Sequence, residues 1–137
     1  MDKCIFCEIG KGNIPAQKVY EDKAVFAILD ISPRSPGHTM VIPKAHADTI
    51  LELPDKDIAP FFKAIKKVTG MIQKALKPDG FTMGINHGSV SGQTVEHLHF
   101  HIIPRWFTDK GKSIHSVVNN PSRETLEKIA NKIKAKK

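Results

Sequence analysis

The sequence predicts an α+β fold in which one long helix packs on a mostly antiparallel sheet of five strands. Five short segments are apolar or alternate with a two-residue period, whereas one long segment repeats its apolar residues every three to four positions. The last two predicted strands are joined by a loop too short for a parallel crossover, which needs about a dozen residues. A chain of 137 residues suits a single domain with one modest core.

The first three predicted strands lie in the N-terminal third of the chain. Residues 19–21 and 24–29 have the composition of a short hairpin. The stretch ISPRSPGH follows, and its proline and glycine content predicts a loop. Residues 38–42 then form the next predicted strand, which Pro43 closes.

The long helix begins at Asp57 and is expected to end near Pro78, Asp79 and Gly80. Its apolar side chains recur at intervals of three and four, which is typical of a helix with one buried face. These positions are Ile58, Phe61, Phe62, Ile65, Val68, Ile72 and Leu76.

Two strands and a terminal helix complete the prediction. Residues 81–86 form a strand, and the Gly/Ser loop HGSVSG leads from it into the last strand, GQTVEHLHFHIIPR. Residues 121–137 form a charged helix with Ser122 as its N-cap. One face of that helix is apolar and carries Leu126, Ile129, Ala130 and Ile133.

The composition is that of an ordinary globular domain. Hydrophobic residues make up 40% of the chain and charged residues 26%, which excludes wholesale disorder. No apolar run approaches the roughly 20 residues of a membrane-spanning helix. The N-terminal stretch MDKCIFCEIG lacks the apolar core of a secretion signal, so we expect a cytoplasmic protein without a membrane partner.

The positive charge is concentrated at the C-terminal end. Residues 105–137 hold 9 of the 21 basic and 3 of the 14 acidic residues, a net charge of +6 out of the total of +7. A basic tail can contact nucleic acid or attract anionic ligands. We favour the simpler interpretation that these charges form the solvated face of the terminal helix.

Three histidines alternate with apolar residues near the end of the predicted sheet. His97, His99 and His101 would point to one face of a strand, and Leu98, Phe100 and Ile102 would point into the core. A metal ion with bonds of about 2 Å can bind two such neighbours on a flat strand but not all three. The three imidazoles are therefore expected to have different roles.

Two cysteines supply half of a metal site. Cys4 and Cys7 stand in the motif CIFC, which is a poor disulfide framework in a cytoplasmic chain. A tetrahedral zinc ion needs two further ligands, for which His46 and His97 are the candidates. The alternative is a pair of free thiols without a metal. If His97 binds zinc, His99 and His101 remain available to a substrate.

A glycine-rich loop precedes the histidines. The stretch NHGSVSGQT offers backbone N–H groups and the Thr94 hydroxyl, which suit phosphate oxygens, although a plain hairpin turn explains it equally well. An imidazole is a natural nucleophile for phosphorus, because it titrates near neutrality. Asp30 closes an apolar strand, where its carboxylate would bind ribose hydroxyls or cap the following turn.

These motifs together resemble the histidine triad (HIT) family. HLHFHII is similar to the family's signature of three alternating histidines, and LDISPRSPGHTMVIPKAH with GQTVEHLHFHIIPR resembles its Hint branch, the prokaryotic type with an N-terminal CxxC. The resemblance extends from Cys4 to Arg105, and the segment 106–137 follows no family pattern. It implies a HIT-like fold, a structural zinc ion and a homodimer joined through the long helix and a strand edge.

The resemblance also implies an activity. Family members hydrolyse or transfer nucleotides at the α-phosphate of nucleoside monophosphate conjugates, through a nucleotidyl-histidine intermediate. His99 matches the nucleophile, and His101 matches the residue that contacts the phosphate oxygens. His97 matches the residue whose carbonyl orients the nucleophile. The remaining matches of this group are Thr94 near the scissile bond and His38 as an auxiliary histidine.

The expected nucleotide site contains further residues by the same resemblance, with an AMP conjugate as the purine substrate. Asp30 matches the ribose ligand, and Asn86 a residue near ribose and phosphate. Gly92 and Gln93 match residues that line the phosphate site. The base pocket is expected to be walled by Phe6, Ile9, Ile14, Ile28 and Ile31.

Three departures and three alternatives accompany this interpretation. Glu96 falls on the core-facing parity of the strand, and His87 stands where the family often has another residue. The divergent segment from Trp106 onward leaves the leaving-group preference open. Within the family, the alternative is a dinucleoside polyphosphate hydrolase. More distant alternatives are a metal-dependent hydrolase using His97 and His99, and a non-catalytic nucleic-acid-binding module.

Overall fold

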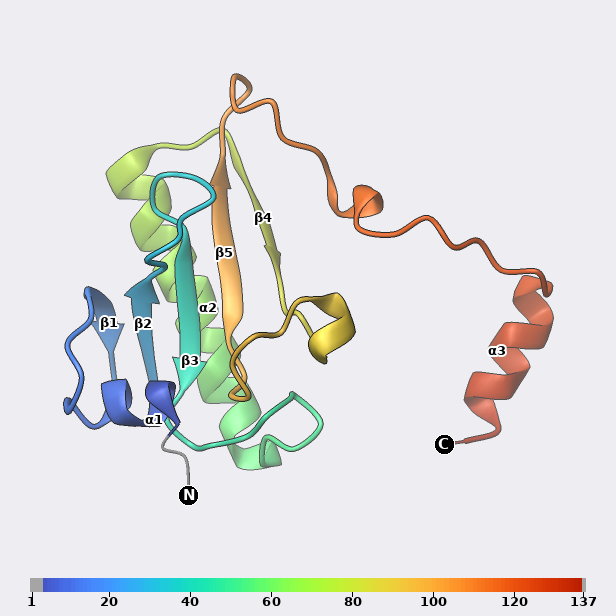
Figure 1. Cartoon of the computed structure of the whole chain (residues 1–137), viewed down its shortest axis with the longest axis horizontal. Coiled ribbons are helices and arrows are strands. Elements are labelled where there is room, and N and C mark those ends of the chain that lie inside the picture. Colours follow the sequence, from blue (N-terminus) through green and yellow to red (C-terminus); the bar gives the residue numbers. More distant parts are fainter. Residues whose placement is uncertain (1–3, 137) are drawn as a thin grey trace.

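The computed structural model describes residues 4–136 and has an α+β fold, as expected from the sequence (Figure 1). Five antiparallel strands form one sheet in the order β1-β2-β3-β5-β4. The long helix packs on one face of this sheet. The strands are β1 (Lys18–Glu21), β2 (Val25–Leu29), β3 (Thr39–Pro43), β4 (Gly80–Gly84) and β5 (Phe100–Arg105).

The long helix α2 (Asp55–Leu76) covers the main core. It begins two residues before the predicted start, and Lys77 ends it in the left-handed conformation that commonly terminates helices. Its buried side chains lie against inward-facing residues of β2, β3 and β5. These helix residues are Phe61, Ala64, Ile65, Val68 and Ile72.

The other face of the sheet is covered by α1 (Ile5–Gly10), a helix that the sequence did not predict. Phe6 and Ile9 of α1 are buried there against Phe26, Ile28, Met40 and Ile42. Strands β2 and β3 are therefore buried on both faces, because their alternate residues pack against α2 on one side and α1 on the other. The short helix α1 also carries both cysteines to the sheet.

The predicted histidine strand is shorter than expected. It begins only at Phe100, so His97 and His99 precede it in irregular backbone, and this part of the strand prediction was wrong. Strand β3 ends at Pro43, which has no N–H for a further ladder bond, and the Leu98 N–H donates instead to the Ala47 carbonyl (2.7 Å).

The predicted division of faces is nevertheless confirmed. Leu98 and Ile102 are buried in the core under α2, and Phe100 packs against that core. Glu96 lies before the strand and is exposed, so its charge does not point into the core as the alternation of the strand had suggested.

The C-terminal segment extends away from the sheet and ends in helix α3 (Leu126–Lys134) (Figure 1). Its N-cap is Thr125, whose hydroxyl accepts the Lys128 N–H, so the prediction of Ser122 was wrong. The Ser122 hydroxyl instead bonds the backbone of Glu124 within the preceding turn. Across residues 4–136, no helix combines the length and apolar character needed to cross a membrane.

Candidate active site and metal centre

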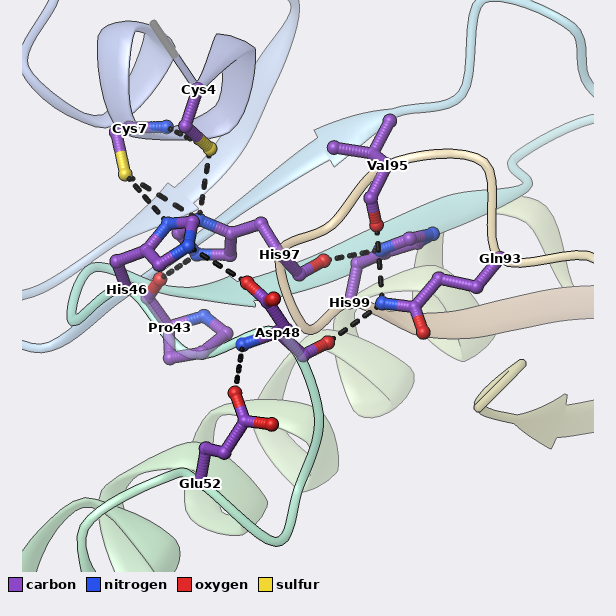
Figure 2. A network of polar contacts seen from close by, with 10 residues as sticks. All are labelled: Cys4, Cys7, Pro43, His46, Asp48, Glu52, Gln93, Val95, His97 and His99. Atoms are coloured by element: carbon purple, nitrogen blue, oxygen red, sulfur yellow. Dashed lines mark hydrogen bonds and ion pairs between the residues drawn. The ribbon is translucent and has the colours of Figure 1, made fainter. Parts of the chain in front are cut away.

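Cys4, Cys7, His46 and His97 converge beside the sheet (Figure 2). The Cys4 sulfur lies 3.3 Å from His97 Nδ1, and the Cys7 sulfur lies 3.3 Å from His46 Nδ1 and 3.5 Å from His97 Nδ1. In a tetrahedral zinc site, bonds of about 2.3 Å to sulfur and 2.0 Å to nitrogen separate such atoms by about 3.5 Å. The four residues, hereafter the Cys–His cluster, therefore fit a structural zinc ion.

The second nitrogen of each cluster histidine is already used. His97 Nε2 lies 2.8 Å from the Pro43 carbonyl, which can only accept, so this nitrogen carries the proton. His46 Nε2 lies 2.9 Å from a carboxylate oxygen of Asp48. Both imidazoles thus present an unprotonated Nδ1 to the sulfurs, as metal ligation requires.

The electrostatics of the cluster favour neutral groups when no cation is bound. Burial and the neighbouring Cys4 together raise the pKa of Cys7 to about 11. Burial also lowers the pKa of His97, which remains neutral. Zinc binds thiolates, so filling the cluster releases protons.

His99 is held in one tautomer next to this cluster. Its Nδ1 donates to the His97 carbonyl at 2.7 Å, so Nε2 carries a free lone pair. The ring is buried, and its edge-to-face neighbours are Phe6 at 5.2 Å and His101 at 5.1 Å between ring centroids. A buried imidazole with a fixed, unprotonated Nε2 is prepared to act as a nucleophile.

His101 is set up as a hydrogen-bond donor by a short relay. The Arg34 backbone N–H donates to His38 Nδ1 (3.1 Å), which leaves the proton of His38 on Nε2. That nitrogen lies 2.9 Å from His101 Nδ1 and donates to it. The remaining proton of a neutral His101 is therefore on Nε2, where it can meet an anionic oxygen.

Burial keeps His101 neutral near pH 7. Burial, and the repulsion that a positive charge would meet from nearby His99 and His38, together lower its pKa to about 4. Burial likewise lowers the pKa of His38, although the Asp30 carboxylate opposes this effect from 3.5 Å. The relay consequently keeps its directions across the neutral range.

Asp30 caps the turn that follows its strand, which is one of the two roles expected from the sequence. One carboxylate oxygen accepts the Ser32 backbone N–H at 2.8 Å, and the other faces His38. This second oxygen retains lone pairs for further donors. The Asp30 carboxylate therefore lies beside the His38–His101 pair while also capping its turn.

The glycine-rich loop, which precedes the histidines in the chain, forms a tight turn. Gly88 (φ 85°) and Gly92 (φ 102°) have left-handed backbones, which allow the chain to turn tightly around Ser89–Ser91. A Cβ on Gly92 would come within 3.7 Å of the Asn86 side chain, so these two residues are neighbours. Thr94 is exposed at the end of the loop.

The structure brings together only part of the expected base pocket. Phe6, Ile9 and Ile28 belong to one buried cluster beneath α1. Ile14 is 37% exposed and Ile31 is 98% exposed, and neither belongs to that cluster. His87, which the sequence flagged as unusual, is also exposed.

The sequence analysis missed Arg34 and Asp48, and it missed that the Gln93 side chain hydrogen-bonds to backbone groups. Arg34 acts through its main chain, which no side-chain pattern can report. Asp48 follows His46 by two residues, and this spacing was the available signal. The Gln93 amide bonds residues on two separate segments, as described below.

A model of the HIT domain matches residues 11–108. An uncharacterised HIT-like protein of Methanocaldococcus jannaschii is 50% identical over 106 residues, covering 77% of this chain and 81% of the relative. The adenosine 5'-monophosphoramidase of Schizosaccharomyces pombe is 39% identical over 97% of both chains. An adenylylsulfatase of Arabidopsis thaliana is 40% identical over 74% of this chain and 52% of its own length.

Two solved structures are also similar to this chain along nearly its whole length. A Streptococcus mutans protein superposes with a TM-score of 0.86 at 38% identity, covering 99% of this chain and 86% of that chain. A zinc-bound histidine triad protein of Mycobacterium smegmatis superposes with a TM-score of 0.74 at 33% identity, covering 98% of this chain and 97% of that chain.

Proposed function

Because this chain belongs to the HIT domain family, we propose that it hydrolyses or transfers nucleotides at the α-phosphate of nucleoside monophosphate conjugates, with AMP phosphoramidates as the preferred class. The observation that carries the proposal is the bond from His99 Nδ1 to the His97 carbonyl, which leaves Nε2 free to attack. A relative named adenosine 5'-monophosphoramidase, similar along nearly the whole chain, supports the substrate class.

In the proposed reaction, His99 Nε2 forms a bond to phosphorus as the bond from phosphorus to the leaving group breaks. The Nε2–H of His101 donates to a phosphate oxygen and stabilises the charge that develops there. The Thr94 hydroxyl lies near the scissile bond and guides the leaving group. Water then attacks phosphorus, which releases the nucleotide and restores His99.

The remaining nucleotide contacts are proposed from the family resemblance. Asp30 binds the ribose through its free oxygen, and Asn86 lies between ribose and phosphate. Gly92 and the backbone of Gln93 line the phosphate site. The base packs against the apolar group named earlier: Phe6, Ile9, Ile14, Ile28 and Ile31.

The metal has a structural role in this proposal. Cys4, Cys7, His46 and His97 would hold zinc, which would crosslink α1 to the segment that follows β3 and the segment that precedes β5. Four protein ligands complete a tetrahedral site and leave no open position for a substrate. This closed ligand set disfavours the metal-dependent hydrolase that the His97–His99 pair also suggested.

We further propose a cytoplasmic homodimer. Phe62, Met71 and Leu76 are apolar side chains exposed on α2, and β4 forms one free edge of the sheet. A second copy covering these features would bury apolar surface and pair an unsatisfied strand edge. Nucleic acid is not a proposed partner.

The test is AMP release from AMP-lysine, compared between wild type and His99→Ala. We expect turnover in wild type, a covalent nucleotide in acid-quenched enzyme, and loss of both in the variant with an unchanged circular dichroism spectrum. Cleavage of diadenosine polyphosphates in place of AMP-lysine would favour the polyphosphate hydrolase. Retention of activity in a correctly folded His99→Ala variant would exclude the covalent mechanism.

A further inference from the structure

The Gln93 side chain ties together three backbone groups. Its Oε1 accepts the Gly88 N–H at 2.8 Å, and its Nε2 donates to the carbonyls of Asp48 (2.6 Å) and Val95 (3.1 Å). Two of these bonds stay within residues 88–95, which are most of the glycine-rich loop and the residue that follows it. The third joins the loop to a segment 45 residues earlier in the chain.

The orientation of this amide is determined by its partners. Rotating it by 180° would place Oε1 against two carbonyl oxygens and Nε2 against an N–H, so only one orientation is compatible with the contacts. In that orientation both N–H groups of Gln93 are used. The side chain therefore has no hydrogen left for a phosphate oxygen unless it abandons the backbone.

Asp48 connects this amide to the Cys–His cluster. Its carboxylate lies 2.9 Å from His46 Nε2, and its backbone carbonyl accepts from Gln93 (Figure 2). The Asp48 N–H is in turn bound by the Glu52 carboxylate at 3.1 Å. A continuous path of hydrogen bonds thus runs from a candidate zinc ligand to the loop that precedes the nucleophile.

We propose that Gln93 is a positioning residue through which the metal-filled Cys–His cluster orders the glycine-rich loop. Zinc would fix the His46 ring, whose bond to Asp48 then holds the Asp48 carbonyl in place for Gln93. The proposal rests on the proposed function only in taking this loop as the phosphate site. It assigns to the Gln93 side chain a role separate from substrate contact.

This path is distinct from the one that reaches the nucleophile. The His97 carbonyl holds His99, whereas the Asp48 carbonyl holds Gln93 and the loop. Breaking the path through the Asp48 carbonyl and Gln93 should therefore make the loop less ordered and weaken nucleotide binding. With the path intact, we expect zinc to tighten nucleotide binding, and linkage requires that nucleotide tighten zinc binding by the same factor.

The experiment compares Gln93→Met with wild type, each with zinc and after chelation. The matched control is Gln73→Met, because Gln73 also donates to a backbone carbonyl, that of Pro78, outside the site. Amide hydrogen exchange of residues 88–95 reports loop order without any ligand. Calorimetric titration with AMP reports the affinity of the phosphate site.

We expect zinc to slow exchange across the loop and to tighten AMP binding about fivefold or more in wild type and in the Gln73 variant. In Gln93→Met, loop exchange should not respond to zinc, and zinc should tighten AMP binding less than in wild type, because only the path through His97 to His99 remains. An equal loss of AMP affinity with and without zinc would overturn the proposal, because it would mean that Gln93 contacts the ligand directly. Loop exchange that ignores zinc in wild type would overturn it as well.

Asp48→Ala keeps the proposal testable if the chelated protein does not fold. This variant retains all four cluster residues and the backbone carbonyl at position 48, and native mass spectrometry verifies its zinc content. Faster loop exchange than in zinc-loaded wild type supports the path, and unchanged exchange overturns it. Absence of AMP binding in wild type would contradict the proposed function alone, since hydrogen exchange decides the coupling independently.

Discussion

Replacing His101 with asparagine should flatten the dependence of stability on acid pH. In the folded protein the pKa of His101 is lowered to about 4, because the ring is buried beside His99 and His38. In the unfolded chain the pKa returns to about 6.5. Between these values the unfolded state binds more protons, so this residue makes folding less favourable as pH falls from 6.5 to 4.

The size of the effect follows from the difference between the two pKa values. At 1.36 kcal/mol for each pKa unit, a fall from 6.5 to about 4 corresponds to about 3 kcal/mol, which partial exposure of the ring reduces to about 2 to 3 kcal/mol. Asparagine does not titrate, yet its carbonyl oxygen can accept the His38 proton as the imidazole does. The variant should therefore avoid this loss.

The assay is urea unfolding of both proteins at pH 7, 6, 5 and 4 and at one protein concentration. Zinc loss at low pH affects both proteins alike, so the difference between their free energies of unfolding isolates His101. We expect wild type to lose about 2 to 3 kcal/mol relative to the variant between pH 7 and pH 4. Parallel curves would refute the assignment of a neutral, buried His101.

Three further predictions concern the nucleophile, the metal and the packing. His99→Ala should abolish AMP release while leaving the circular dichroism spectrum unchanged, and residual turnover would contradict its role. His97→Ala should lose zinc by mass spectrometry and melt at a lower temperature, and a fully loaded, equally stable variant would remove it from the ligand set. Gly37→Ala should cost about 1 to 3 kcal/mol of unfolding free energy, because its backbone is left-handed (φ 85°) and a Cβ would displace the exposed end of the Leu76 side chain, 2.5 Å away. Gly12→Ala, with a similar φ of 81° but open space, is the control and should cost about 1 to 2 kcal/mol by chemical denaturation.

The sequence predicted the fold class and the two cysteines of the cluster from local patterns, and it added His46 and His97 because a tetrahedral zinc site needs two further ligands. Period-two strands and the CxxC motif are visible without tertiary information. Helix α1 was missed because a helix of six residues gains little from propensity. Its stability comes from the burial of Phe6 and Ile9 and from the Cys4 sulfur, which accepts the Cys7 N–H at its N-terminus.

Other features could not be predicted because they depend on the approach of distant segments. Nothing in the stretch GQTV indicates that the Gln93 amide would bond a carbonyl 45 residues away. The exposure of Ile31 illustrates the same limit, since the family resemblance assigned it to the base pocket and only the fold shows that its side chain is 98% exposed. The N-cap of the terminal helix was predicted as Ser122, and only the observed start of the helix identifies Thr125.

The early end of the strand pairing explains how one short segment can contribute to both the proposed metal site and the proposed nucleotide site. Had residues 97–101 formed a flat strand, their three side chains would lie side by side and their carbonyls would be used by the sheet. Because regular pairing begins at Phe100, His97 directs its side chain to the cysteines and its free carbonyl to His99. The two roles of His97 are thus divided between side chain and main chain, and only the side-chain role can be removed by substitution.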